Sequence, residues 1–286
     1  MKYCLFILLA CLIAACSGPD RQVAVRNSAY YWRTEWHIDS AEQSFLQEYD
    51  IRRIYCRYFD VVMDEGEPMP NATIRFSEPI PEGIDMVPTV YITEDCMHSQ
   101  HKGLARKIVD RVIQMNETHD IRGVSELQMD CDYTARSRQI YFDFLNQLRT
   151  EARQHGMRLS VTIRLHQLSM AVPPADYGVL MLYNTGDPRR FYERNPILDR
   201  RDVQPYLQHL PDYNLTLAAA YPIFRWQRDI QGVRVEHVAE AGEILQVKQA
   251  VERKRADLSQ HIITYHLDKE NIRRYGNETF EAIYHH

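Results

Sequence analysis

Two aspartates, Asp130 and Asp132, end an apolar run and are the residues of this chain best placed to do chemistry. Alternate residues of a β-strand point to the same side, so both carboxyls would face one way and perturb each other. Like charges at that spacing raise the pKa of one carboxyl, while a nearby arginine such as Arg57 or Arg164 would keep the other ionised. Two carboxyls with separated pKa values are what glycoside hydrolysis needs. A purely structural ion-pair network is the alternative.

Short β-rich runs must position these residues, and they alternate with helical patterns along the chain. Strands are expected at 29–36, 53–62, 87–93, 124–130, 158–165, 177–183, 215–221 and 261–267. The clearest helical patterns lie at 103–115, 137–155, 242–257 and 269–284. Eight strands that alternate with helices over roughly 250 residues predict an α/β fold, a single-domain (β/α)8 TIM barrel. A doubly wound open sheet is the chief alternative.

Alternation within the fourth strand indicates which side chains face the barrel interior. Its apolar set, Leu127, Met129 and Cys131, should pack against the helices, which leaves Asp130 and Asp132 pointing inward. Cys131 is therefore expected to be a packing residue and not a nucleophile.

The same rule applies to two later strands. It places Arg164 and His166 in the inward set of the fifth strand, and Thr264 and His266 in that of the eighth.

Polar and aromatic residues follow several strands, and barrel active sites lie at the carboxyl ends of the strands. The candidate catalytic residues are Asp130, Asp132, Glu94 and Asp95, and the candidate ligand-binding residues are Arg57, Arg164, His166, Tyr183, Tyr221, Trp226 and His266. Tyr221 and Trp226 are candidate platforms for sugar rings. Asp130 and Asp132 are expected to open into the largest pocket of the protein.

The segment Glu126-Leu-Gln-Met-Asp130-Cys-Asp132-Tyr-Thr134 resembles the fourth-strand motif of family 18 chitinase-like barrels, Asp-x-x-Asp-x-Asp-x-Glu. Asp130 and Asp132 match its second and third acids, and Thr134 stands where that family has its proton-donating glutamate. The chain is more similar to uncharacterised glycoside-hydrolase-like barrel lipoproteins of bacteria, which carry an acidic strand-four segment before a Tyr- and Phe-rich helix. The resemblance implies a barrel that acts on or binds carbohydrate.

Three functions follow from these residues. The first is a hydrolase in which Asp130 or Asp132 is nucleophile or base and Glu94 or Asp95 is the acid. The second is a carbohydrate-binding barrel with the same pocket and no competent acid. The third is a metal-dependent hydrolase with Asp130, Asp132, His166 and His266 as ligands, which we rank last because no His-x-His pair is present. No cofactor or metal is expected.

The first residues read as a targeting segment, with a cationic start and a charge-free apolar run too short to span a membrane. Its end, Ile13-Ala14-Ala15-Cys16, resembles the bacterial lipobox, in which the cysteine is lipidated and becomes the mature N-terminus. The prediction is a signal peptide at 1–15, a lipidated tether at 16–28 and the barrel at 29–286, anchored in the cell envelope. Ser17 favours the outer membrane by analogy with bacterial sorting rules. A plain secretory leader is the alternative.

Composition excludes other classes of protein. The formal net charge is −5 without a basic run, which argues against a nucleic-acid partner. Hydrophobic residues make up 45% of the chain, enough for a large core. After the leader and Cys16, only Cys56, Cys96 and Cys131 remain, an odd number with no metal-ligand spacing, so neither a disulfide framework nor a structural zinc site is expected.

Overall fold

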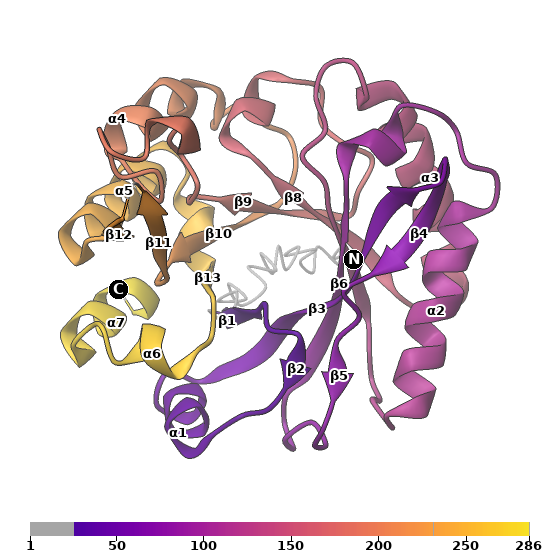
Figure 1. The fold of residues 1–286 in the computed structure, drawn as a ribbon, viewed down its shortest axis with the longest axis horizontal. Helices are drawn as coiled ribbons and strands as arrows, with labels where there is room; N and C mark the ends of the chain where they lie inside the picture. Colours follow the sequence, from indigo (N-terminus) through magenta and orange to yellow (C-terminus); the bar gives the residue numbers. More distant parts are fainter. Residues whose placement is uncertain (1–25, 231, 286) are drawn as a thin grey trace, which may run out of the picture.

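A computed structural model describes residues 26–230 and 232–285, which form a closed barrel of eight parallel strands (Figure 1). The barrel strands are β1 (Arg26–Tyr31), β3 (Ile51–Asp64), β6 (Asp85–Ile92), β7 (Glu126–Asp130), β8 (Arg158–Ile163), β9 (Tyr177–Met181), β10 (Leu217–Pro222) and β13 (His261–Tyr265). The sheet closes because β1 pairs with both β3 and β13. The predicted α/β barrel is confirmed, and all eight predicted strands are present.

The N-terminal predictions mostly fall outside this region. The predicted signal peptide at 1–15 and the lipidation site Cys16 lie outside the described residues. β1 begins at Arg26, so the last residues of the predicted tether belong to the barrel.

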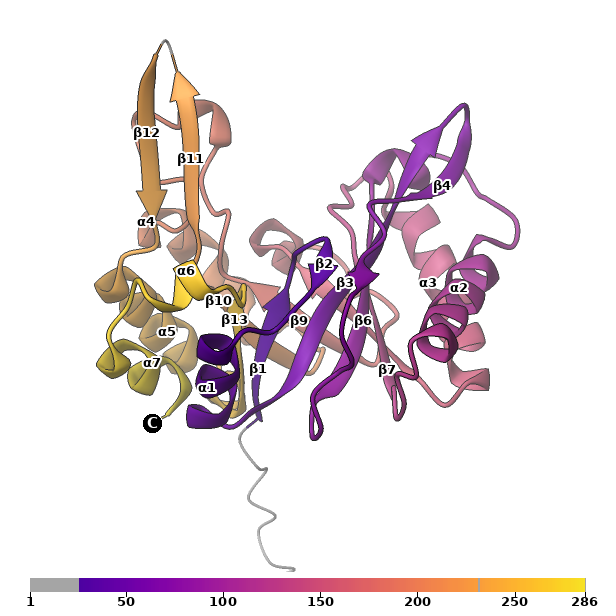
Figure 2. The same ribbon diagram turned by 60° about the horizontal axis from the view of Figure 1, so that its bottom comes forward.

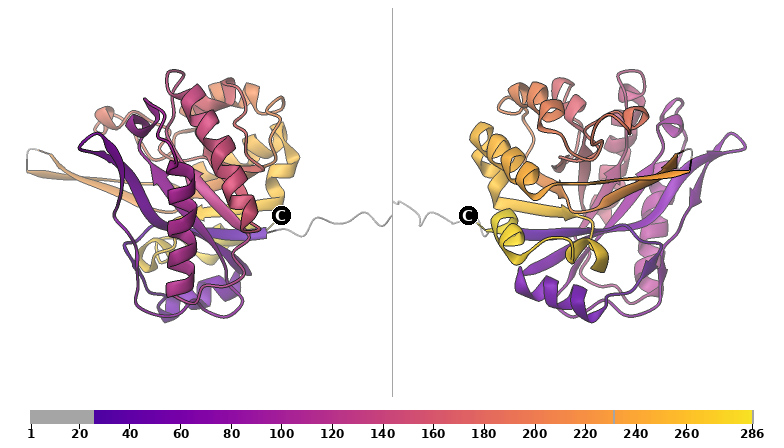
Figure 3. Two further views of the ribbon diagram at one scale, coloured as in Figure 1. Left: turned by 90° about the vertical axis from the view of Figure 1, so that its right-hand side faces the viewer. Right: turned by 60° about the vertical axis from the view of Figure 1, so that its left-hand side comes forward.

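Helices cover the outside of the barrel unevenly. The α-helices are α1 (Ser40–Glu48), α2 (Leu104–Thr118), α3 (Arg138–Gln154), α4 (Arg200–Val203), α5 (Ala241–Lys254), α6 (Lys269–Ile272) and α7 (Asn277–Tyr284). The long helices α2 and α3 lie side by side (Figure 3), whereas only a 3₁₀-helix, Leu165–Ser169, separates β8 from β9. Within the described part of the chain, no helix is both long enough and apolar enough to cross a bilayer.

Two hairpins project from the same end of the barrel, the end at which the parallel strands finish (Figure 2). One is the extension of β3 that pairs antiparallel with β4 (Glu67–Asn71), and the other consists of β11 (Arg225–Ile230) and β12 (Val233–Val238). The short strands β2 (Glu35–Trp36) and β5 (Arg75–Phe76) pair with each other beside the barrel. None of these additions to the barrel was predicted.

Side chains on the two faces of the barrel strands form two separate buried clusters. Leu127, Met129 and Cys131 belong to the larger cluster, which joins the sheet to the helices, as alternation in the fourth strand predicted. Gln128 points inward, where its Oε1 accepts a hydrogen bond from the Tyr30 hydroxyl at 2.8 Å. Cys131 is buried in the larger cluster, which fits its predicted packing role. Burial also raises the pKa of its thiol, which argues against a nucleophile.

The predicted orientation of the eighth strand is wrong. Ile263 and Tyr265 face the barrel interior, where they pack with Tyr30 and Tyr183. Thr264 faces outward, with its Oγ1 2.6 Å from the hydroxyl of Tyr284 in α7. The middle of this strand is buried on both faces, so the contrast between polar and apolar residues does not reveal its orientation.

The carboxylate of Glu42 connects the segments that follow the first and last barrel strands. This fully buried side chain accepts hydrogen bonds from Arg33 at 3.0 Å and from the backbone amides of Asp39 at 3.0 Å and Lys269 at 3.1 Å. Asp39 in turn caps α1 by accepting from the amide of Glu42 at 2.9 Å, which completes a capping box. One carboxylate therefore ties the segment after β1 to α1 and to the start of α6.

Replacing Glu42 with alanine should lower the free energy of unfolding by about 2–4 kcal/mol, because two backbone amides lose their acceptor and the partly buried Arg33 loses one of its carboxylate partners. Chemical denaturation of Glu42→Ala measures this loss. Gln43→Ala, an exposed change on the same helix, is the matched control and should stay within about 0.5 kcal/mol of the parent. Equal effects of the two changes would contradict the role given to Glu42.

Candidate functional site

Asp130 ends β7 and lies at the bottom of the barrel mouth. Its side chain is only 4% exposed and accepts hydrogen bonds from the Thr162 hydroxyl at 2.6 Å and from Arg164 at 3.2 Å. Burial raises the pKa of the Asp130 carboxyl, and the neighbouring Asp132 adds to the shift, which outweighs the attraction of Arg164. Asp130 therefore takes a proton more readily than an exposed aspartate does.

Arg164 joins the two predicted acids. Its Nε donates to Asp132, whose side chain is about half exposed, while its Nη2 donates to Asp130. The pKa of the guanidinium is raised because the two carboxylates overcome the effect of burial. The structure thus brings Asp130, Asp132 and Arg164 together, with one cation shared between two carboxyls.

Aromatic rings line the mouth beside this cluster. Tyr183 stacks on Tyr265 with ring centres 4.4 Å apart, and Tyr265 also lies 5.5 Å from Tyr30 and 5.7 Å from Trp32. The Tyr183 hydroxyl is buried and makes no hydrogen bond within the described part of the chain. Tyr183 was predicted as a site residue, whereas Tyr265 was not.

Arg57 is held at the mouth by an ion pair with the carboxylate of Asp60. Its Nε donates to Asp60 at 2.7 Å, and its guanidinium lies 5.6 Å from the centre of the Trp32 ring. The pKa of Arg57 is raised chiefly by the hydrogen bond to Asp60. Trp32 therefore has one cationic neighbour and two aromatic neighbours, Tyr30 and Tyr265, at the rim of the site.

A pocket of about 280 Å³ opens at the mouth. Its lining residues come from the ends of β7, β8 and β9 and the loops that follow: Asp132, Arg164, Leu165, His166, Met181, Tyr183, Asn184, Thr185 and Tyr206. His166 is exposed on its edge. Asp132, Arg164, His166 and Tyr183 were predicted as site residues, but Asp130 and Arg57 do not line this pocket.

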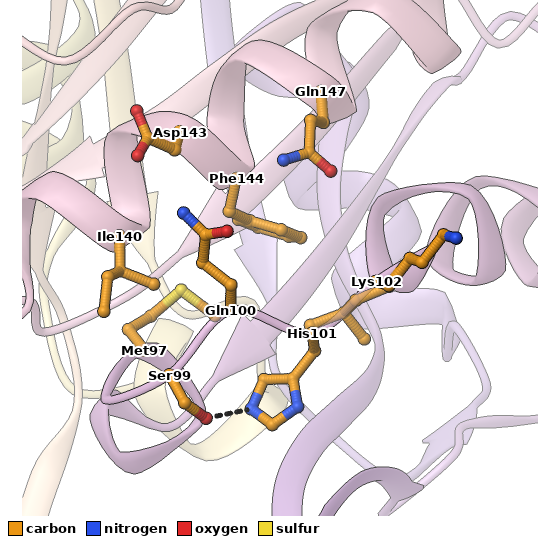
Figure 4. Close-up of a pocket in the computed structure, with 10 residues that line it drawn as sticks. Met97, Ser99, Gln100, His101, Lys102, Ile140, Asp143, Phe144 and Gln147 are labelled. Atoms are coloured by element: carbon orange, nitrogen blue, oxygen red, sulfur yellow. Dashed lines mark hydrogen bonds between the residues drawn. The ribbon is translucent and has the colours of Figure 1, made fainter.

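The expectation that the acidic pair opens into the largest pocket is wrong. A larger pocket, of about 330 Å³, lies outside the mouth between the segment 97–104 and α3 (Figure 4). Its floor includes Met97 and Phe144, and its rim carries Ser99 and His101, which are hydrogen-bonded at 3.1 Å. Arg164 restricts the space over the acids, because the guanidinium occupies part of the mouth.

Glu94 and Asp95 follow β6 in a 3₁₀-helix, Glu94–Met97, and both are engaged in local hydrogen bonds. Glu94 accepts from the Ser137 hydroxyl at 2.8 Å, and its hydrogen bond with Thr134 is the main cause of a lowered pKa. Asp95 is exposed and accepts from the amide of Cys96 at 3.0 Å. A lowered pKa keeps Glu94 ionised, the opposite of what a proton donor requires.

Tyr221 and His266 lie away from the pocket. Tyr221 is fully buried in the cluster between sheet and helices, with Glu252 of α5 nearby, so it cannot stack on a ligand at the mouth. His266 lies near Arg33 and Asp268, where burial lowers the pKa of its imidazole, and it does not line the mouth pocket. Both assignments required an inward orientation that these side chains do not have.

Trp226 lies on the hairpin formed by β11 and β12. Its ring contacts Phe191 with centres 6.0 Å apart, and the guanidinium of Arg228 lies 5.1 Å from it. The ring is partly exposed, but these two neighbours already cover part of its surface.

The metal-dependent alternative gains no support from the geometry. Asp132 and His166 line the mouth pocket, but His266 does not. In residues 26–230 and 232–285, no three His, Cys, Asp or Glu side chains gather in a way that could hold a metal ion.

Comparison with known proteins places the fold. Neither protein-family profiles nor curated protein sequences match the chain. A chitinase from Chromobacterium violaceum is similar in structure with a TM-score of 0.58 and 12% identity, over 91% of this chain and 98% of that one. A class V chitinase from Pseudomonas fluorescens gives a TM-score of 0.57 and 12% identity, with the same coverage of 91% and 98%.

A third similar structure is a spore cortex-lytic enzyme from Bacillus megaterium, with a TM-score of 0.56 and 9% identity over 85% of this chain and 71% of that one. At such low identity the likeness concerns the fold. The chain thus has the (β/α)8 barrel fold of these chitinases and of the spore cortex-lytic enzyme.

Proposed function

We propose that this protein binds carbohydrate at the barrel mouth without cleaving the glycosidic bond. The observation that carries the proposal is the position of Arg164 between Asp130 and Asp132. Hydrolysis by two carboxyls needs a protonated acid and a free carboxylate on opposite sides of the bond, about 5–10 Å apart, and hydrolysis assisted by the substrate still needs a protonated acid. Here one guanidinium engages both carboxyls, and Glu94, the nearest predicted acid, has a lowered pKa.

The rest of the mouth suits a sugar. Trp32 and Tyr265 are partly exposed and offer aromatic surface, and the faces of sugar rings pack on such surfaces. The Tyr183 hydroxyl is buried and unpartnered among the described residues, so a ligand oxygen could satisfy it. The outer part of the Asp132 carboxylate remains exposed and can accept hydrogen bonds from sugar hydroxyls. The likeness in fold to proteins named chitinases makes chito-oligosaccharides the first ligands to test.

The protein should bind chitohexaose, measured by calorimetry, without shortening it, measured by chromatography after prolonged incubation. Tyr183→Phe should weaken binding about fivefold, because a hydrogen bond to a buried hydroxyl contributes on the order of 1 kcal/mol. Its melting temperature should not fall, since the hydroxyl lost has no partner among the described residues.

Tyr221→Phe is the matched control, because its hydroxyl is also buried and unpartnered among the described residues but faces the helices. This variant should bind chitohexaose as the parent does. Release of shorter products, abolished by Asp130→Asn, would instead establish the hydrolase. If the parent and Tyr183→Phe bind chitohexaose with equal affinity, the Tyr183 hydroxyl does not contact the ligand.

Arg164→Met should lower the free energy of unfolding by about 3–5 kcal/mol at pH 7, because two neighbouring carboxyls lose their shared cation. A carboxyl whose folded pKa is raised destabilises the fold above that pKa and no longer does so below its unfolded value. Loss of Arg164 raises the Asp130 pKa further, so the difference from the parent should shrink as the pH falls toward about 4.

Denaturation at several pH values measures this difference. Arg153→Met is the control, since Arg153 is largely exposed and its partner Asp176 keeps Arg149. It should change stability by less than about 1 kcal/mol. A loss for Arg164→Met that stays constant with pH would show that the carboxyls of Asp130 and Asp132 are not its cause.

We further propose that the barrel is anchored in the bacterial cell envelope, in the outer membrane, through a lipid on Cys16. The support comes from the charge-free run that ends in Ile-Ala-Ala-Cys. Lipoprotein anchoring relies on several acyl chains, because one chain alone binds membranes only weakly.

Cys16→Ala should release the protein from the membrane fraction and change its processing. Fractionation and the apparent mass of the mature chain measure both effects. Cys4→Ala, a change within the predicted leader, is the control and should leave anchoring intact. A Cys16→Ala variant that stays in membranes would refute the anchor.

A further inference from the structure

One wall of the mouth continues outward from the pocket. Asn184 and Thr185 line the pocket, and the loop 187–195 that follows leaves and returns at a narrow neck. At this neck the amide of Thr185 donates to the carbonyl of Ile197 at 3.4 Å, and that of Gly186 donates to Pro196 at 3.2 Å. The loop therefore projects from the edge of the pocket.

The hairpin formed by β11 and β12 holds this loop in place. Arg228 donates to the carbonyl of Pro188 at 2.9 Å, and its guanidinium lies 5.0 Å from the centre of the Phe191 ring. His237 donates from Nε2 to the carbonyl of Phe191 at 2.6 Å, and Asn195 donates to that of Val238 at 2.6 Å. Loop and hairpin form one wall, and the hairpin rises beside the mouth in Figure 2.

Tyr192 is displayed on this wall. Its neighbour Phe191 is buried, yet Tyr192 itself is 59% exposed, and no other ring of the described residues packs against it. Among the described residues, only Met69 and Val233 are other large hydrophobic side chains with comparable exposure, and both lie on the two hairpins at this end of the barrel. An exposed aromatic ring next to a pocket can pack its face against a sugar ring.

The pocket itself is small. Its volume of about 280 Å³ is below the range of about 300–1,000 Å³ that is usual for small-molecule sites. A ligand of several sugar rings must therefore extend beyond the pocket onto the surface next to it. The wall formed by the loop 187–195 and the hairpin starts at the pocket's own edge.

We propose that Tyr192 stacks on a sugar ring outside the pocket, so that the ligand is an oligosaccharide chain and not a single sugar. This inference rests on the proposed function and adds the length of the ligand to it. Tyr192 is a specificity-determining residue in this arrangement: it favours long chains over short ones. Tyr183 contacts the ring in the pocket whatever the length of the chain.

The test compares chitobiose with chitohexaose in titration calorimetry. Tyr192→Ala should lower the affinity for chitohexaose about three- to tenfold, the usual effect of losing one aromatic stack, and leave the affinity for chitobiose unchanged. Tyr192→Phe should restore the affinity for chitohexaose, because the ring and not the hydroxyl makes the contact. Tyr183→Phe should lower the affinity for both ligands by the same factor.

Met69→Ala is the control, an equally exposed change on the opposite hairpin, and should bind both ligands as the parent does. An unchanged affinity of Tyr192→Ala for chitohexaose, or an equal loss for both lengths, would overturn the role of Tyr192 and leave the proposed function standing. A parent protein that binds neither ligand would overturn both.

Discussion

Polar side chains in the barrel interior are largely shielded from water, so most of them must find a partner on another strand. On β7 this constraint applies at three successive levels. Glu126 pairs with Arg53 of β3 at 3.1 Å, and Gln128 accepts from Tyr30 of β1 at 2.8 Å. Asp130, at the carboxyl end of the strand, accepts hydrogen bonds from Thr162 and Arg164. The site at the mouth is the last level of this internal column of polar groups.

The same constraint explains which parts of the fold could be predicted. Where a strand carries polar residues inward, as β7 does, alternation reveals both its period and its orientation. Strand β13 was found by its apolar run but oriented wrongly, because Ile262, Ile263 and Thr264 are all buried. Orientation there depends on neighbours that are distant in sequence, such as Tyr284.

The hairpin of β11 and β12 was missed although the sequence contains a signal for it. Alternating residues flank Gln231-Gly232, and a glycine between two such runs is a common hairpin turn. The signal was weak because most side chains of both strands are at least partly exposed, so no apolar face marks the hairpin. This omission matters for the site, since the hairpin fixes the wall that carries Tyr192.

For the site itself, sequence position identified the acids but could not assign their roles. Asp130, Asp132 and Arg164 were expected at one mouth, and they meet there. Whether the acids do chemistry depends on how the arginine is shared between them, which follows from the register of β7 and β8. Tyr265 was overlooked for the same reason that β13 was misoriented, because the alternation rule assigned it to the helix side.

The charge balance at the mouth connects the fold to the kind of ligand it can hold. One guanidinium is shared by two carboxyls, so the cluster holds no unpaired cation, and burial raises the pKa of the Asp130 carboxyl. Arg57 and Asp60 form a second balanced pair. A strongly charged ligand would have to break one of these pairs, which leaves a poorly solvated charge behind. A neutral ligand rich in hydroxyl groups breaks none of them and can still satisfy Tyr183 and the exposed oxygen of Asp132. The pairing that argues against hydrolysis therefore also favours a neutral sugar over an ionic one.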